Sequence, residues 1–392
     1  MKRIYLDHAA TTYVLPEVLK EMEPYFTDIF GNASSLHSFG QEGAVAVAEA
    51  REKVAKILGA NSNEIYFTSC GTESNNWALR GIAYKKGKGH IITSQIEHPA
   101  ILQTCADLEK KGFEVSYIGV NNNGIINLEE LKKAIRPDTI LISVMSANNE
   151  MGAIQPIEEI AKIAKENKIP FHTDAVQAIG AIKFNVKEMG IDMLSLSGHK
   201  FYGPKGIGVL YIRNGLGIAK FMTGGEQERN MRAGTTNTPL IVGLAKAITL
   251  AYENFDQKVE ELAKKRDYLI NRILTEIPYS SLNGDSKNRL PNNVNISYKF
   301  IEGESILMLL DFDGIAVSTG SACSSGSLKS SHVLLAMGTD IELAHSSVRM
   351  TLGEKTTYED LDYTVDCLKK VIENLRNMSP LFAEFKGGIT NV

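Results

Sequence analysis

The sequence has few cysteines, and none of them forms a Cys-x-x-Cys pair. Its four cysteines are scattered along the 392 residues, far from one another. This distribution excludes a disulfide-rich secreted scaffold and is typical of a reducing compartment, where thiols stay free for chemistry. We therefore expect a cytoplasmic protein, and we expect no metal site.

Long apolar runs and an excess of positive charge are also absent. No stretch approaches the roughly 18 apolar residues that a membrane span requires. The net charge is −4 and the pI is about 6.1, so no overall positive field attracts nucleic acid or an anionic membrane. With 43% apolar and 22% charged residues, the composition is ordinary for a globular protein of two or three domains.

A glycine-rich nucleotide-binding signature is missing as well. No Gly-x-Gly-x-x-Gly follows a predicted strand and opens a helix, which argues against a nucleotide-binding Rossmann protein. Residues 64–213 instead alternate short apolar runs with amphipathic helical patterns. The apolar runs predict seven buried strands, at Glu64–Ser69, His90–Gln95, Phe113–Val120, Ile140–Ala147, Ile169–Ala175, Met193–Ser197 and Gly208–Arg213.

This alternation predicts an α/β fold with a mainly parallel seven-stranded sheet between helices. Some neighbouring strands have no helix between them, so we expect a mixed sheet. We expect residues 1–277 to form a large domain and residues 278–392 a smaller α/β domain, on which the amino-terminal segment packs. The remaining predicted elements are helices at Pro156–Lys168, Leu240–Tyr252, Gln257–Ile277 and Thr357–Asn377, and strands at Asn292–Lys299, Gly314–Thr319 and Ser347–Leu352.

Small and polar residues gather where the predicted strands end. In a parallel sheet these ends meet at one edge, where functional residues collect. The residues concerned are Cys70-Gly71-Thr72-Glu73, Glu97-His98, Asn148-Asn149, Asp174, Gln177 and Ser197-Gly198-His199-Lys200.

Pyridoxal 5'-phosphate (PLP) makes four demands that this set can meet. Gly71-Thr72 at a helix amino terminus offers free N–H groups, a hydroxyl and a favourable dipole to the phosphate. Lys200 can bind the aldehyde as an imine, and His98 can cover a face of the ring. Asp174 can keep the ring nitrogen protonated, because a charge pair at ~4 Å is worth about 4 kcal/mol at an effective dielectric of about 20.

Each of these residues also has an ordinary structural explanation. Asp174 taken alone is typical of a helix cap, and His98 of the residue before a helix. Lys205 is a second candidate for the imine, but its surrounding glycines and proline indicate a turn. Lys200 is favoured because it and Asp174 end successive predicted strands.

Cys323 differs from the other cysteines in its surroundings. Cys70 follows a buried strand, while Cys105 and Cys367 lie in amphipathic helices, where packing as a small apolar residue explains them. Cys323 lies in a glycine- and serine-rich segment that offers no core, so we expect an exposed, mobile thiol. Because a free thiol is only a few per cent ionised at neutral pH, its site must supply deprotonation.

Together and in this order, these residues resemble the NifS/IscS-type cysteine desulfurases, which are class V aminotransferase-like enzymes of PLP fold-type I. The resemblance covers essentially the whole chain. The motifs that carry it are Tyr5–Thr12, Gly31–Ser35, Phe67–Glu73, Asn148–Glu150, His172–Gln177, Ser197–Gly206 and Ser318–Gly326.

The resemblance implies a role for each matching residue. Lys200, Cys323 and His98 would be catalytic. Asn32 and Arg349 would bind the substrate carboxylate, although the inward alternation of the neighbours of Arg349 also allows that side chain to face water. PLP would be bound by Gly71, Thr72, His98, Asn149, Asp174, Gln177, Ser197, His199 and Lys200, joined by Thr235 from the partner subunit of a homodimer.

The implied reaction converts L-cysteine to L-alanine and leaves the sulfur as a persulfide on Cys323. The acceptor would be a sulfur-trafficking protein: an iron–sulfur scaffold is favoured, and tRNA thiolation and cofactor-assembly partners stay open. A selenocysteine lyase, another fold-type I enzyme such as an aminotransferase, and a non-catalytic scaffold are the alternatives. Ala33, Cys70 and Thr236 depart from the usual residues of the family, and the last of these bears on the role of Thr235.

Overall fold

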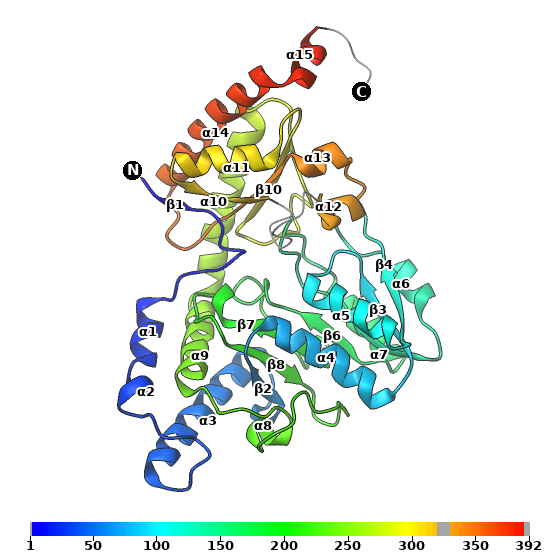
Figure 1. Ribbon diagram of the computed structural model, residues 1–392, viewed down its shortest axis with the longest axis vertical. Coiled ribbons are helices and arrows are strands. Elements are labelled where there is room, and N and C mark those ends of the chain that lie inside the picture. The colour runs from blue at the N-terminus through cyan, green and yellow to red at the C-terminus, as the bar shows by residue number, and fades with distance from the viewer. Residues whose placement is uncertain (1, 320–329, 388–392) are drawn as a thin grey trace.

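The computed structural model describes residues 2–319 and 330–387. A large sheet flanked by helices occupies the lower part of Figure 1, and a smaller sheet with its own helices lies above it. The helices are α1 (Pro16–Met22), α2 (Pro24–Thr27), α3 (Ser38–Leu58), α4 (Gly71–Lys86), α5 (Pro99–Lys110), α6 (Leu128–Ala134), α7 (Ile157–Glu166), α8 (Gln227–Asn230), α9 (Thr238–Tyr252), α10 (Phe255–Glu276), α11 (Gly303–Phe312), α12 (His332–Ala336), α13 (Ile341–His345), α14 (Tyr358–Met378) and α15 (Pro380–Lys386), with the 3₁₀ turns η1 (Ser62–Glu64) and η2 (Gly198–Lys200).

The large sheet confirms the predicted fold class. Seven strands of the described residues lie in the order β2-β8-β7-β6-β5-β3-β4. All neighbours pair in parallel except β8, which is antiparallel to both β2 and β7, so the sheet is mixed as expected. Its strands are β2 (Ile65–Thr68), β3 (His90–Ser94), β4 (Glu114–Ile118), β5 (Thr139–Ser143), β6 (Phe171–Asp174), β7 (Met193–Ser197) and β8 (Gly208–Ile212).

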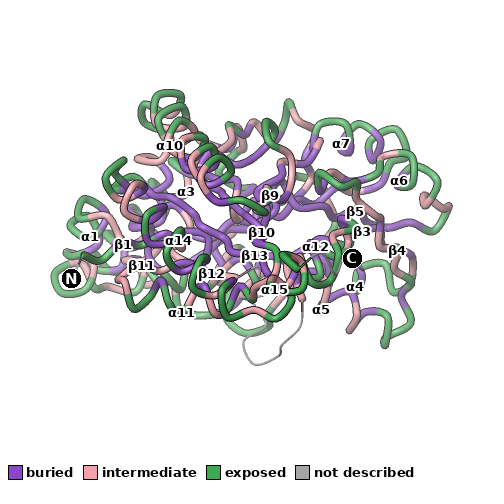
Figure 2. The backbone as a smooth tube through the Cα atoms, turned by 90° about the horizontal axis from the view of Figure 1, so that it is seen from above, coloured by how far each residue is buried: buried purple, intermediate pink, exposed green. Residues whose placement is uncertain are grey.

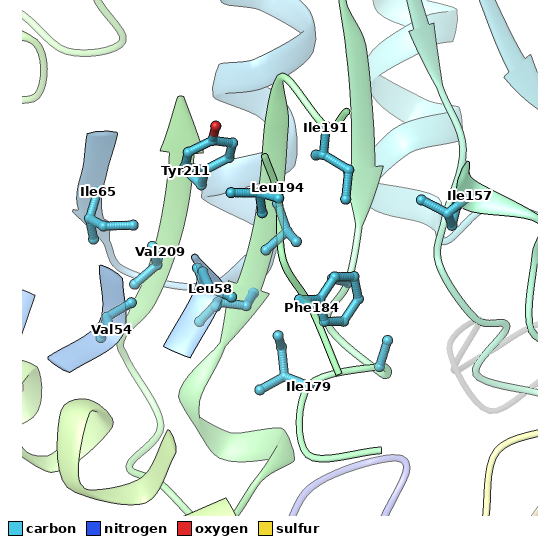
Figure 3. Close-up of a cluster of buried hydrophobic side chains, with 14 of the residues drawn as sticks. Val54, Leu58, Ile65, Ile157, Ile179, Phe184, Ile191, Leu194, Val209 and Tyr211 are labelled. Carbon is cyan, nitrogen blue, oxygen red and sulfur yellow. The ribbon is translucent and has the colours of Figure 1, made fainter. Parts of the chain in front are cut away.

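Both faces of this sheet are buried, because successive side chains of a strand point to opposite faces. One face packs on α4 and α5 through Ile91, Leu141, Met193 and Leu210. The neighbouring residues Ile92, Ile142, Leu194 and Val209 face α3, α7 and α9. Figure 3 shows the second layer, in which Val54 and Leu58 of α3 lie close to Val209 of β8, and Figure 2 shows how the buried residues run through the middle of the molecule.

A second core lies against a four-stranded antiparallel sheet, in the order β12-β13-β10-β9. Its apolar residues come from α10, α11 and α14 as well as from the strands. The strands are β9 (Ser280–Leu282), β10 (Asn293–Tyr298), β12 (Ser318–Thr319) and β13 (Ser347–Thr351). The carboxyl-terminal part of α10 precedes residue 277 and yet contributes to this second core. The predicted domain boundary after residue 277 therefore stays a prediction.

The amino-terminal segment crosses from one sheet to the other. Strand β1 (Ile4–Tyr5) pairs in parallel with β11 (Ile315–Ala316), and Leu6 is buried in the second core. The single strand predicted at Gly314–Thr319 is therefore divided in two: β11 pairs with β1, and β12 pairs with β13. The division occurs at Val317, which lies between two short strands that belong to different sheets.

None of the helices in the described ranges combines the length and the apolar composition that crossing a membrane requires.

Candidate active site

A cavity of about 310 Å³ lies at the edge of the large sheet where the parallel strands end. This volume is within the range of small-molecule and cofactor sites. The residues that line it come from the amino-terminal segment, α4, the ends of β5, β6 and β7, η2 and β13. They are Ala9, Ala10, Cys70, Gly71, Thr72, Asn75, His98, Met145, Ala147, Asn149, Asp174, Val176, Gln177, Ser197, His199, Lys200 and Arg349.

The amino terminus of α4 forms one end of the cavity. No side chain caps this helix, whose N-cap residue is Cys70. A Cβ atom on Gly71 would lie 2.6 Å from Cγ2 of Val176, so only glycine fits this turn against the end of β6. An uncapped amino terminus with its partial positive charge is suited to an anion, and here Thr72 adds a hydroxyl at the same edge.

Asp174 is a buried carboxylate at the end of β6. Its Oδ1 accepts the backbone N–H of Val176 at 2.9 Å, and its Oδ2 accepts the side-chain amide of Asn75 at 2.6 Å. These donors balance part of the cost of burying the charge. Gln177, on the loop that follows, is held by a bond from Nε2 to the carbonyl of Ala9 at 3.0 Å.

Lys200 lies in η2, directly after β7, and its Nζ reaches across the cavity to the amino-terminal segment. The ammonium group donates to the carbonyl of Ala9 at 2.5 Å and to that of Ala10 at 2.9 Å. Lys205, the rival lysine, is exposed and does not line this cavity. The geometry therefore brings Lys200, and not Lys205, next to Asp174.

Two histidines at the cavity have pKa values below the ordinary value of a histidine. His98 is the N-cap residue of α5, and its Nδ1 accepts from the backbone of Ala100 at 3.1 Å. Burial lowers the pKa of His98; the charges of Lys200 and His332 lower it further, while Asp174 opposes them. Burial, with Lys200 and Lys205 nearby, lowers the pKa of His199 to about 4.

Arg349 on β13 is buried, so the alternative that this side chain faces water is wrong. Only 2% of it is exposed. Its Nη2 lies 2.9 Å from Oδ1 of Asp7, and its Nη1 donates to the carbonyl of Asn149 at 3.1 Å. Arg349 thus contributes a positive charge to the wall of the cavity that comes from the smaller sheet.

Three predicted residues are not among those that line the cavity in the described part of the chain. Cys323 lies outside the described residues. Asn32 is exposed beyond the large sheet, where its Oδ1 accepts from the backbone of Ser34 at 2.9 Å. Thr235 is exposed as well, and neither residue lines the cavity of this one chain. Their roles stay predictions.

Sequence reasoning gave no role to several residues at this site. Asn75 and the backbone of Ala9 and Ala10 line the cavity. Glu97 is fully buried beside it; burial raises its pKa to about 8, although Ser94 and the backbone of Met145 donate to it. Ala9 and Ala10 belong to the motif Tyr5–Thr12, and Asn75 follows the motif Phe67–Glu73 by two residues, but nothing in the sequence indicated which neighbours these residues contact.

The residues present fit PLP. The cavity offers an anion site, a lysine and a carboxylate, arranged along one sheet edge. Two buried polar atoms at its wall, Oδ1 of Asn75 and Nε of Arg349, have no hydrogen-bond partner in the part of the chain that the structure describes. The anion site, the lysine and the carboxylate match in chemistry the phosphate, the aldehyde and the ring nitrogen of PLP.

Comparison with known proteins identifies the family. The family model described as aminotransferase class-V matches residues 4–364. A protein of Dictyoglomus turgidum named cysteine desulfurase IscS is 56% identical over 390 residues, which cover 98% of this chain and 99% of that protein. Cysteine desulfurases and class V aminotransferases are PLP enzymes.

Solved structures agree over nearly the same length. A structure titled NifS-like protein superposes with a TM-score of 0.90 at 41% identity, covering 95% of this chain and 100% of that one. Another, titled SspA in complex with cysteine, superposes with a TM-score of 0.79 at 39% identity, covering 89% and 98%. The chain therefore belongs to the aminotransferase class-V family of PLP enzymes, and within it to the NifS/IscS-type cysteine desulfurases.

Proposed function

We propose that this chain is a PLP-dependent cysteine desulfurase that converts L-cysteine to L-alanine and transfers the sulfur as a persulfide on Cys323. The observation that carries the proposal is the single cavity that unites Lys200, Asp174 and the amino terminus of α4. Full-length similarity to proteins named cysteine desulfurase supports the choice of substrate, and so does the related structure that contains cysteine.

The cofactor supplies an electron sink that stabilises negative charge at the α-carbon of a bound amino acid. In the proposed site, Lys200 would hold the aldehyde of the cofactor, and its amine would hold and move the proton at that carbon. The carbonyls of Ala9 and Ala10 orient the Nζ atom for this work. Asp174 would hold the ring nitrogen, and His98 would cover a face of the ring.

The phosphate site is built from the α4 amino terminus and the end of β7. Gly71 and Thr72 would donate from the helix, and Ser197 and His199 line the same part of the cavity. Burial, with Lys200 and Lys205 nearby, lowers the pKa of His199 to about 4, and a neutral ring has one N–H that can donate to the phosphate.

The substrate carboxylate would bind Arg349. Its Nη1 and Nη2 are each held by one acceptor, which fixes the plane of the guanidinium. The Nε atom is buried and has no hydrogen-bond acceptor in the part of the chain that the structure describes, while the side chain as a whole lines the cavity. A preformed, oriented guanidinium is the arrangement that recognises a carboxylate with good geometry.

Both described ends of the segment that contains Cys323 contact residues that line this cavity or are next in sequence to its lining, which supports the role of the thiol. Before the segment, Ser318 of β12 pairs with Arg349 of β13. After it, the hydroxyl of Ser331 donates to Glu150, and the ring of His332 lies 3.1 Å from the carbonyl of Glu97. A chain of ten residues that leaves and returns at these positions has the reach to bring a thiol to the bound substrate.

We also propose that the chain works as a homodimer. Leu19, Phe26, Phe30, Leu36 and Phe39 leave large apolar side chains exposed on one amino-terminal stretch, with Leu36 93% exposed. A second copy would cover this surface and would let Thr235 reach the phosphate site of its partner. An iron–sulfur scaffold as acceptor and a cytoplasmic location complete the proposal, the latter supported by the scattered cysteines.

The purified protein tests this function directly. The visible spectrum should reveal bound PLP, and added L-cysteine should yield alanine together with sulfide when a reductant is present. L-selenocysteine, assayed in parallel, distinguishes a desulfurase from a selenocysteine lyase. Bound PLP without sulfide release from cysteine would contradict the proposal and favour another fold-type I activity.

A further inference from the structure

Asn75 on α4 connects two parts of the cofactor cavity and has no role in the mechanism above. It is 1% exposed, and its Nδ2 donates to Oδ2 of Asp174 at 2.6 Å. The other oxygen of Asp174 accepts the backbone N–H of Val176 at 2.9 Å. Each carboxylate oxygen therefore has one fixed donor, and the carboxylate cannot rotate without breaking a hydrogen bond.

The position of Asn75 on α4 ties this carboxylate to the phosphate site. Asn75 lies four residues after Gly71, so both residues lie on the same face of the helix, about 6 Å apart along its axis. Gly71 packs against Val176, the residue whose N–H holds Asp174. One rigid helical turn thus contacts the cavity at the phosphate end and at the Asp174 end.

The orientation of the Asn75 amide follows from the chemistry of its partner. An ionised carboxylate only accepts hydrogen bonds, so the amide nitrogen faces Asp174 and the amide oxygen faces away. That oxygen is buried, and in the described ranges 2–319 and 330–387 it has no donor. Asn75 therefore acts on the cavity that it lines through its amide nitrogen.

We propose that Asn75 is the positioning residue for Asp174: its amide fixes the carboxylate toward the cofactor ring nitrogen, and α4 sets the spacing between that carboxylate and the phosphate site. The inference rests on the proposed function and deepens it. Asn75 acts through Asp174 and takes no part in proton transfer.

Two substitutions distinguish positioning from packing. Asn75→Ala removes the donor and leaves a small cavity. Asn75→Asp keeps the volume and replaces the donor by a carboxyl group that donates only while it holds a proton. Two carboxyls at this distance share a proton at low pH and repel each other once both are ionised. The Asp variant should therefore lose function as the pH rises.

The other titratable and charged groups in and beside the cavity are the same in the variants and in the wild type. Activity is therefore expressed as the ratio of variant to wild type at each pH, between about pH 6 and pH 9. The groups are Cys70, Glu97, His98, Asp174, His199, Lys200 and Arg349.

The matched control is Asn76, the next residue on α4. Its Nδ2 donates to the carbonyl of Thr72 in its own helix, and its Oδ1 accepts from Arg80. Asn76→Ala removes the same side chain from the same helix without touching Asp174. All variants are compared as holoenzymes for turnover, and as apoproteins for PLP affinity by titration.

Asn75→Ala should weaken PLP binding and lower kcat, each by about tenfold, which is the size of effect seen when a residue that holds a metal ligand by a hydrogen bond is removed. The KM for cysteine should change less than about threefold. Asn75→Asp should approach wild type at the acidic end and fall with rising pH, while Asn76→Ala follows wild type throughout. If the activity of Asn75→Asp relative to wild type stays constant with pH, the inference is overturned, even if Asn75→Ala fails to fold. A wild type that binds no PLP would instead refute the proposed function.

Discussion

Arg349 and Asp7 form an ion pair with 2.9 Å between Nη2 and Oδ1, although 342 residues separate them in the sequence. The pair joins the amino-terminal segment to β13 beside the cavity. It neutralises a guanidinium that is almost completely buried. The amino-terminal segment therefore contributes charge balance to the proposed substrate site as well as the carbonyl groups that hold Lys200.

We expect Asp7→Asn to reduce the free energy of unfolding by about 2 kcal/mol, because it leaves a buried guanidinium with only partial compensation. The KM for cysteine should rise by about tenfold, since the charged carboxylate that orients the arginine is replaced by a neutral amide, a weaker acceptor. Urea denaturation and steady-state kinetics measure the two effects. Asp138→Asn, which breaks an exposed pair with Arg136, should change stability by less than about 0.5 kcal/mol.

Lys200→Ala should lose the covalent attachment of PLP and all desulfurase turnover, whereas Lys205→Ala should keep both. The reason is geometric, because Lys200 lines the cavity with Asp174 and Lys205 does not. Borohydride reduction followed by peptide mass spectrometry locates the attached cofactor. Finding it on Lys205 would overturn the assignment.

Asp174→Ala should lower turnover by about three orders of magnitude, if the ring-nitrogen pair is worth about 4 kcal/mol. PLP retention should fall as well. Because the Asn75 amide would lose its acceptor in this variant, Asp174→Asn serves as the conservative comparison, which keeps the volume and removes the charge. Near-normal turnover in both variants would exclude an electron-sink role for the carboxylate.

Cys323→Ala should fold, bind PLP and bind cysteine, because Cys323 is remote in sequence from every predicted cofactor ligand. The variant should nevertheless release no sulfide, because it lacks the thiol that accepts the sulfur. In the wild type, mass spectrometry after a cysteine pulse should find one added sulfur on the peptide that contains Cys323. Cys70→Ala is the control, since Cys70 lines the cavity but has no assigned role in sulfur transfer. A persulfide on Cys70, together with full sulfide release from Cys323→Ala, is the contrary result.

Stability should fall as the medium becomes acidic, and His172 is one cause. This ring is fully buried between the hydroxyls of Ser143 and Ser195, and burial lowers its pKa to about 3. At acidic pH the unfolded chain therefore binds a proton on His172 that the folded chain does not. The contribution of His172 to the free energy of unfolding is fully present above the unfolded pKa of about 6.5. It decreases by up to about 1.4 kcal/mol per pH unit between pH 6.5 and pH 3.

His172→Gln removes the titrating ring and should reduce this pH slope, although the variant itself will be less stable. The measurement is the urea midpoint at several pH values for both proteins. An unchanged slope would assign the acid sensitivity to other buried groups, such as His199.

Much of the fold was predictable because local rules decide it. Strands buried on both faces appear in the sequence as continuous apolar runs, and β7 begins and ends at the predicted residues. The strand ends then identified Asp174, Lys200 and the α4 turn without any knowledge of the strand order.

The rest depended on contacts between distant segments. Asn75 is a polar residue in the middle of a helix, and nothing in the sequence indicates that it reaches Asp174. The carbonyls of Ala9 and Ala10 are backbone groups, so their side chains give no signal. Whether Arg349 faces solvent or the cavity depends on how β13 pairs with β10 and β12, which alternation alone leaves open.

The route of residues 4–10 also has a consequence for biosynthesis. A ribosome makes this segment before the strands with which it pairs, since Ile4 lies beside Ile315 and the backbone N–H of Thr351 donates to the carbonyl of Leu6. Contacts of such long sequence separation form late and slowly. The wall of Ala9 and Ala10 carbonyls that holds Lys200 can therefore be completed only when the chain has emerged beyond β13, and the nascent protein should be unable to hold its cofactor tightly until then.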